Sequence, residues 1–229
     1  MPYTMVAGVT PWRHQWVVVS ARMAGAVFAA EAPRLFSSFA EVLDERPAFA
    51  SIVVNAPIGY VDRPESGMRT CDREARSMLG RHAQAYRYNP ARSIIRDGLA
   101  VHERTDEVFN TLLLPRYRDV ANQMSPYRQR VVHEGHPELS FFQLNGNMPL
   151  TWPESSDQGR EERHQLLARR FADLESLLEG TRDTDLPERT VLGAFALVWT
   201  ARRVFARAAD RIPTDPEWDS EGLRMQIVM

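Results

Sequence analysis

Lysine is absent from this sequence, and cysteine occurs only once. All 28 basic residues are arginine, which excludes a Schiff-base lysine, a lysine general base and the lysine of a phosphate-binding P-loop. Any anion must therefore be bound by arginine, histidine or backbone amides. With Cys71 as the single cysteine, an internal disulfide framework and a multi-cysteine metal site are also excluded. Cys71 is expected to be packed and unreactive.

Long apolar runs and a strong net charge are missing as well. No stretch is long enough to span a bilayer, and the N-terminal residues lack the basic flank of a secretory signal. The net charge of −2 gives no global attraction to nucleic acid. We therefore expect a cytoplasmic protein without a membrane partner. Nucleic acid is not favoured as a partner, and the oligomeric state is not predicted.

The composition that remains is that of an ordinary globular protein. Of the 229 residues, 44% are hydrophobic and 25% are charged, which suits one sizeable core and predicts a single domain over residues 1–229. The segment Asn145 to Gly159 is rich in turn-forming residues and is expected to form a loop or lid. Trp152 is the aromatic residue that such a lid would carry.

The spacing of apolar residues alternates between strand-like and helix-like along the chain. Strands are predicted at Met5–Val9, Gln15–Ala21, Gly25–Ala30, Ile52–Val54, Arg130–His133 and Met225–Val228, the last as an edge strand or a packed tail. Helices are predicted at Leu35–Arg46, Cys71–Leu79 with Thr70 and Gly80 as caps, Glu107–Met124, Pro137–Leu144, along the stripe Leu167, Phe171, Leu174 and Leu178, and at Glu188–Asp210. This order predicts an α/β fold, a mixed sheet with helices on its faces.

One strand ends in a conspicuous polar residue. The stretch SIVVNAPIGY, Ser51 to Tyr60, is a β-branched run that breaks at Asn55 into a Pro-Gly turn. In α/β proteins the working groups lie where buried strands end. Asn55 is therefore a candidate site residue, although its amide neither carries charge nor gives up a proton.

Seven short motifs follow one another in an order that is similar to a known family. They are AGVTPWRHQWVVVS (Ala7 to Ser20), NAPIGY (Asn55 to Tyr60), RTCDREARSMLG (Arg69 to Gly80), HEGHPELSFFQLNG (His133 to Gly146), GREERHQLL (Gly159 to Leu167), AFALVWTARR (Ala194 to Arg203) and EGLRMQIVM (Glu221 to Met229). Together they resemble a widespread bacterial family of predicted nucleases with a ribonuclease H-like fold. The resemblance covers nearly the whole chain and implies that fold for it: an N-terminal antiparallel meander plus parallel strands.

The resemblance also implies a site of carboxylates, and here the sequence departs from the family. The family pattern has aspartate where this chain has Thr10, Asn55 and Gly193, and it tends to be acidic where this chain has Arg189 and Thr190. Ribonuclease H-like nucleases use two divalent ions clamped by several carboxylates. The chain is therefore expected to be a divergent member that has lost these ligands.

Too few carboxylates remain for a two-metal clamp. Magnesium needs charged oxygen ligands to offset its dehydration, and Thr10, Asn55 and Gly193 supply none. Glu134 and Glu138 together could hold at most one weakly bound ion. The sequence therefore predicts no metal site and no cofactor.

Each remaining candidate also has a structural explanation. Glu138 falls in the first turn of a predicted helix, where the helix dipole favours an acid. His136 precedes that helix, and a single histidine is commonly structural. Arg73, Arg76 and Arg160 are each expected on the surface, unless they converge on one mouth as an anion-binding rim.

Three functions are consistent with these residues. The first is a metal-independent enzyme or binding protein acting on a small metabolite, in a specialised pathway. There, Glu134, His136 and Glu138 would supply acid–base chemistry. The ligand would be bound by Asn55 and Thr10 and by the group Arg73, Arg76, Arg160 and Trp152.

The second function has no catalytic activity, and the third retains the metal-dependent activity of the family. An inactive scaffold would bind a protein or a nucleic acid partner. A residual metal-dependent nuclease would rely on Glu134 and Glu138 with a single ion. Fold alone does not decide among the three, because function depends on the site.

Overall fold

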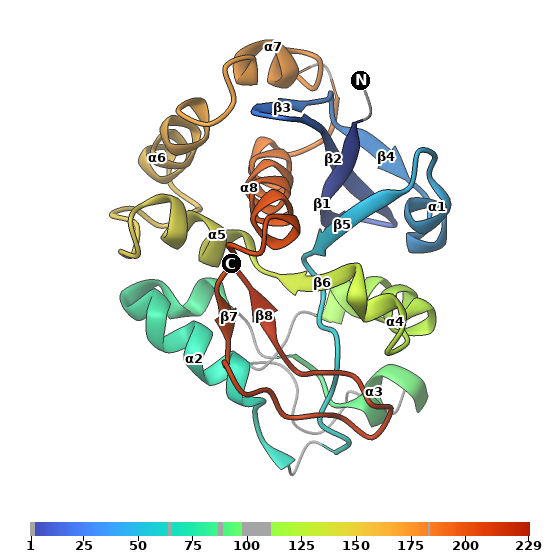
Figure 1. Ribbon diagram of the computed structural model, residues 1–229. Helices are drawn as coiled ribbons and strands as arrows, with labels where there is room; N and C mark the ends of the chain where they lie inside the picture. The colour runs from blue at the N-terminus through green and yellow to red at the C-terminus, as the bar shows by residue number, and fades with distance from the viewer. Residues whose placement is uncertain (1–2, 64–65, 87–88, 98–110, 183) are drawn as a thin grey trace.

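The structure is a computed structural model and describes residues 3–63, 66–86, 89–97, 111–182 and 184–229. Eight strands of this part of the chain form one mixed sheet in the order β3-β2-β1-β5-β6-β8-β7, with β4 also pairing with β2 (Figure 1). The strands are β1 Thr4–Trp12, β2 Gln15–Ala24, β3 Val27–Ala30, β4 Arg34–Phe36, β5 Phe49–Val54, β6 Val132–Gly135, β7 Arg211–Ile212 and β8 Ile227–Val228.

The sheet changes from antiparallel to parallel at β1. Strand β2 runs antiparallel to β1, β3 and β4, whereas β1, β5, β6 and β8 run parallel to one another and β7 closes the edge antiparallel to β8. Parallel strands need crossover connections, which the helices supply. The helices are α1 Phe39–Asp44, α2 Thr70–Leu79, α3 Arg92–Asp97, α4 Leu114–Gln123, α5 Pro137–Leu144, α6 Asp157–Ala168, α7 Leu174–Glu179 and α8 Glu188–Phe205.

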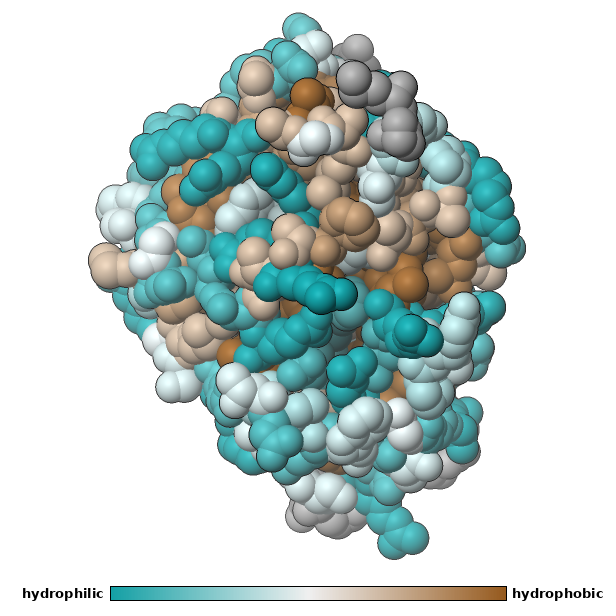
Figure 2. Space-filling model, in the orientation of Figure 1, coloured by the Kyte–Doolittle hydropathy of each residue, from teal (hydrophilic) through white to brown (hydrophobic). Residues whose placement is uncertain are grey.

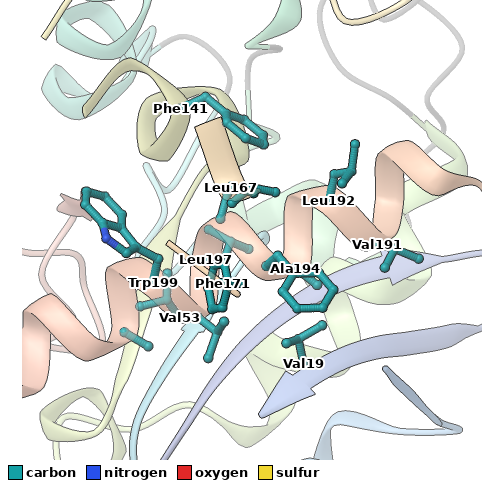
Figure 3. Close-up of a cluster of buried hydrophobic side chains, with 14 of the residues drawn as sticks. Val19, Val53, Phe141, Leu167, Phe171, Val191, Leu192, Ala194, Leu197 and Trp199 are labelled. Carbon is teal, nitrogen blue, oxygen red and sulfur yellow. The ribbon is translucent and has the colours of Figure 1, made fainter. Parts of the chain in front are cut away.

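Helix α8 lies across one face of the sheet because its residues are apolar on most sides. Figure 3 shows Ala194 and Leu197 of this helix in one cluster with Val19 of β2 and Val53 of β5. The close approach depends on Gly8 of β1, where an added Cβ would lie 2.2 Å from the carbonyl oxygen of Ala194. A second apolar cluster covers the opposite face, under α1 and α4. Helix α8 therefore fixes its own N-terminus against the end of β1.

Several expected elements are confirmed. The hairpin of β1 and β2 and the strands β3 and β5 form where apolar spacing places them. Helix α5 has the predicted bounds, with Pro137 as its first residue. Helix α2 ends at the predicted cap Gly80, but its N-cap is Arg69, and Thr70 is already helical.

Other boundaries differ from expectation for local reasons. The predicted helix Leu35–Arg46 begins only at Phe39, where the Ser38 hydroxyl caps it, because Arg34–Phe36 pairs with β2 instead. The stripe Leu167, Phe171, Leu174 and Leu178 is buried, but it is divided between α6, the turn at Phe171 and α7. Helix α8 stops at Phe205 and not at Asp210.

The remaining differences concern short elements. Strand β6 runs over Val132–Gly135, two residues later than expected, after a 3₁₀ turn at Arg128–Arg130. Residues Met225–Val228 were expected as an edge strand or a packed tail, yet β8 lies inside the sheet between β6 and β7. Of the predicted helix Glu107–Met124, residues 107–110 lie outside the described part, and α4 begins at Leu114 with Pro115 in its first turn.

Most of the face shown in Figure 2 is hydrophilic. Among the described residues, no helix combines the length and the apolar character needed to cross a membrane.

Candidate functional site

A cleft of about 350 Å³ lies where the parallel strands β1, β5 and β6 end. Strand ends of one direction meet at one edge of a sheet, so residues far apart in sequence converge there. The cleft is lined by Pro11, Asn55 to Pro57, Glu134 to Glu138, Ala85, Tyr86, Asn89, Leu113, Tyr117, Glu154, Arg189 and Thr190. Four of the nine predicted site residues, Asn55, Glu134, His136 and Glu138, are among them.

Asn55 presents an unused amide to this cleft. Its backbone N–H donates to the carbonyl of Val9 over 2.8 Å, which ties the end of β5 to β1. Within the described residues its side chain has no hydrogen-bond partner, although it lines both the cleft and an adjoining hollow of about 100 Å³. The amide therefore has a donor and an acceptor available for a ligand.

Thr10 lines only the adjoining hollow, and its hydroxyl is already engaged. The Thr10 side chain is buried, and its Oγ1 donates to the Thr190 carbonyl over 3.0 Å. This bond joins the end of β1 to the first turn of α8. Gly193, one turn further, is equally committed to packing, because an added Cβ would lie 3.2 Å from Cγ of Pro137.

Glu134 is held by an arginine that the sequence did not single out. Nη1 of Arg69 donates to Oε2 of Glu134 over 2.8 Å, and Nη2 donates to Oε1 over 2.6 Å. The backbone N–H of Ile58 also donates to Oε2, over 2.7 Å. Burial raises the pKa of Glu134, because the cleft floor excludes water from its carboxylate.

Arg69 holds a second carboxylate at the same time. Its Nε and Nη2 donate to the two oxygens of Asp72 over 3.0 and 2.6 Å. Asp72 also accepts from the Tyr86 hydroxyl and the Asn89 amide. Burial would raise the pKa of Asp72, but Arg69 outweighs it and the pKa is lowered. We call Arg69, Asp72 and Glu134 the arginine triad.

Glu138 is locked in a separate pair. Nε and Nη2 of Arg163 donate to its two oxygens over 2.9 and 2.5 Å, and both side chains are almost fully buried. Arg163 is also fixed by the carbonyl of Gly159, over 2.7 Å. A bidentate arginine pair of this kind engages both carboxylate oxygens in a fixed geometry.

His136 lies between these two glutamates and caps α5. Its Nδ1 accepts from the backbone N–H of Glu138 over 3.2 Å, so the ring proton of the neutral imidazole resides on Nε2. Burial lowers the pKa of His136 to about 4. At neutral pH the residue is therefore an uncharged donor, and its Nε2 has no partner among the described residues.

The other predicted binding residues lie outside the cleft. Arg73 donates to Met68 and Thr70, and Arg76 donates to the carbonyls of Ala83 and Tyr86. Arg160 pairs with two surface acids and lines a neighbouring hollow. Trp152 is 48% exposed beside a further hollow on α6. The structure thus does not bring these four residues together.

The segment expected to be a loop or lid is tied down near its centre. The Glu162 carboxylate accepts from the backbone N–H groups of Thr151 and Trp152, and Arg81 donates to the Thr151 carbonyl. Of this segment only Glu154 lines the cleft.

Arg69 and Arg163 are the functional-site residues that sequence reasoning missed. Each stands far from its partner in the chain, since Arg69 is 65 residues from Glu134 and Arg163 is 25 from Glu138. Both lie inside motifs that resemble the family, which was the available signal. Cys71, close to Arg69, is buried, and burial raises the pKa of its thiol, which disfavours a role as a nucleophile.

The residues present do not fit a two-metal centre. In the part of the chain that the structure describes, no group of three or more histidine, cysteine, aspartate or glutamate side chains could hold a metal ion. The two glutamates nearest the strand ends are each engaged by a guanidinium. A hard cation would have to displace both arginines to gain its oxygen ligands.

Comparison with known proteins gives one match. A family described as "Protein of unknown function (DUF429)" matches residues 8–218. No curated protein and no solved structure matches the chain.

Proposed function

Since the chain belongs to the DUF429 family, whose description assigns no activity, we propose a function from the cleft itself: it is a metal-independent binding site for a small molecule. The site is built on a ribonuclease H-like sheet, and the protein acts in the cytoplasm. The strand order supports this fold, because an antiparallel meander of β3, β2 and β1 continues into the parallel strands β5 and β6. That is the arrangement the motif resemblance implies.

One contrast carries the proposal. Each acidic group of the cleft floor is paired with a guanidinium inside the protein, while its neutral polar groups are free. Glu134 and Glu138 are bound bidentately by arginines. The Asn55 amide and Nε2 of His136 have no partner among the described residues and line the same cleft. Unused buried or half-buried polar groups favour a ligand that completes their hydrogen bonds.

The same contrast favours binding over acid–base catalysis. A general base must have a free lone pair at a pKa near the working pH. The lone pair of Nδ1 of His136 is occupied by the Glu138 N–H, and the pKa of the imidazole is about 4. Glu138 has its carboxylate in the Arg163 pair. The proposed role of His136 is therefore to donate a hydrogen bond from Nε2.

The metal-dependent nuclease is disfavoured on the same grounds. Its ion would need Glu134 and Glu138, which face guanidinium groups instead of an open coordination site. The scaffold alternative is less favoured, since the free Asn55 amide and Nε2 of His136 lie in a cleft and not on a flat surface.

A ligand screen in the presence of a chelator tests the proposal. Purified protein in EDTA is screened by thermal shift against a chemically diverse set of small molecules, and hits are confirmed by calorimetry. We expect binders whose affinity falls about tenfold in Asn55→Ala, because a ligand hydrogen bond is lost. The matched control is Asn145→Ala, whose amide bonds only local carbonyls. Binding that requires added Mg²⁺ or Mn²⁺, or that ignores Asn55, would overturn the proposal.

A further inference from the structure

The arginine triad lies directly beneath the cleft and is unbalanced in charge. Arg69, Asp72 and Glu134 are only 2%, 1% and 4% exposed. One guanidinium faces two carboxylates. The additional partners of those carboxylates are all neutral: the Tyr86 hydroxyl, the Asn89 amide, the Cys71 thiol and the Ile58 N–H. With both acids ionised, the buried group carries one negative charge that no neighbour among the described residues compensates.

An uncompensated buried charge is costly, so such a group either retains a proton or meets an external cation. The directions of the pKa shifts indicate which of the two carboxylates is the harder to ionise. Burial raises the pKa of Glu134, while Asp72 remains an easily ionised acid beside Arg69. Glu134 is also the member of the triad that lines the cleft. Of the three residues of the arginine triad, only Glu134 can therefore present the uncompensated negative charge to a ligand in the cleft.

The remaining charges of the cleft balance. Glu138 is neutralised by Arg163, and the mouth carries one acid, Glu154, and one base, Arg189. Among the described lining residues the excess negative charge is thus that of the triad. The rings of Tyr86 and Tyr117 line the same cleft, and aromatic faces attract cations.

We infer that the ligand of this cleft carries an organic cation, a protonated amine or a guanidinium, that contacts Glu134. The inference rests on the proposed function, since it names the ligand class of the same site. Among the described residues, Oε1 of Glu134 accepts from Arg69 alone, whereas Oε2 accepts from both Arg69 and Ile58. A lone pair of Oε1 is therefore open to an N–H of the ligand. A single such position serves an ammonium group but not the oxygen shell of a metal.

Three probes of matched size test the charge preference. Benzylammonium, benzyl alcohol and benzoate are titrated into the protein in EDTA, with binding followed by NMR. We expect benzylammonium to bind about tenfold more tightly than either of the others, as for a hydrogen bond to a charged group. The preference should collapse in Glu134→Gln, in which Arg69 and Asp72 remain as a neutral pair. Glu74→Gln, on α2 but outside the cleft lining, is the control and should retain it.

Asp72→Asn separates charge from contact. Asp72 does not line the cleft, yet its loss also neutralises the triad while Glu134 stays in place. Reduced preference for benzylammonium in this variant supports the electrostatic explanation. The inference is overturned if benzoate or benzyl alcohol binds best, if none of the probes binds, or if the preference survives in both variants. In those cases the chelator screen with Asn55→Ala still judges the proposed function independently.

The pH dependence of the unmutated protein covers the case in which a variant fails to fold. Benzylammonium affinity should fall as the pH is lowered through the raised pKa of Glu134, because protonation removes the charge; benzyl alcohol should show no such fall. Among the described residues, the ionisable groups around Glu134 are Arg69 and Asp72, together with Tyr60, Cys71 and Tyr86. His136 gains its proton near pH 4. A profile that stays flat across the whole pH range in which the protein remains folded would contradict the inference.

Discussion

The Arg69 guanidinium donates two hydrogen bonds to the Glu134 carboxylate, Nη1 to Oε2 over 2.8 Å and Nη2 to Oε1 over 2.6 Å, although the two residues are 65 positions apart in the chain. The contact ties the segment before α2 to the end of β6, at the floor of the cleft. It leaves Glu134 with one open acceptor position and makes the rest of its carboxylate part of the framework.

Removal of Arg69 should destabilise the fold strongly. Arg69→Met leaves Glu134 and Asp72 buried without a cation, and breaking a buried pair from one side costs about 3–5 kcal/mol. The free energy of unfolding from urea titration measures the loss. Arg73→Met is the control, since Arg73 is exposed and should change stability by less than about 0.5 kcal/mol. A loss below about 1 kcal/mol for Arg69→Met would show that the triad is not structural.

Acidic residues placed at the strand ends should not create a metal site. In Thr10→Asp with Asn55→Asp, Glu134 and Glu138 remain bound to Arg69 and Arg163, so few oxygens are free for an ion. Calorimetry with Mn²⁺ should therefore show no binding tighter than millimolar. Addition of Gly193→Asp should lower stability further, because its Cβ would crowd Pro137. Micromolar Mn²⁺ binding by the double variant would refute this reading of the cleft floor.

His136 should make the protein less stable in acid. Its pKa is about 4 in the folded protein and near 6.5 in an unfolded chain. The unfolded state therefore binds more protons between these values, and the contribution of His136 to stability, complete above about pH 6.5, is lost as the pH falls toward 4.

The variant His136→Asn isolates this effect. Asparagine is also a good N-cap, so the helix start is preserved while the titrating group is removed. Urea unfolding at several pH values should give a shallower decline from pH 6.5 to 4 than in the unmutated protein. His14→Asn, at an exposed residue, should leave the slope unchanged. If the free energy of unfolding of His136→Asn declined with pH as steeply as that of the unmutated protein, the imidazole of His136 would not be desolvated in the fold.

Gly8 should tolerate no side chain. In Gly8→Ala the new methyl group would meet the backbone of α8 at 2.2 Å, which forces the helix away from β1. Overpacking of this kind costs about 1–3 kcal/mol or more, and the melting temperature should fall accordingly. At Gly180 an added Cβ has its nearest neighbour at 3.9 Å, so Gly180→Ala should melt within about two degrees of the unmutated protein. Equal melting temperatures for the two variants would mean that α8 does not rest on β1.

The sequence predicted where the cleft lies, but not which of its side chains are already engaged in ion pairs. Asn55 was identified because a β-branched run breaks there, and Pro137 because proline favours the first turn of a helix; both signals are local. The engagement of Glu134 and Glu138 depends on Arg69 and Arg163, whose distance along the chain leaves no periodic trace. Strand β8 has two residues, too few for a pattern, and its interior place in the sheet is set by its neighbours.

The hydrogen bond from Thr10 to Thr190 opposes the return of an acidic residue at position 10. An acid at position 10 would break the bond that seats the first turn of α8 on β1, and a side chain at position 193 would press on Pro137. Both of these steps toward a carboxylate-lined site would therefore lower stability before any ion could be bound. A change at Asn55 breaks no side-chain hydrogen bond among the described residues, but the other two positions each oppose an acid, so the neutral cleft is easier to keep than to reverse.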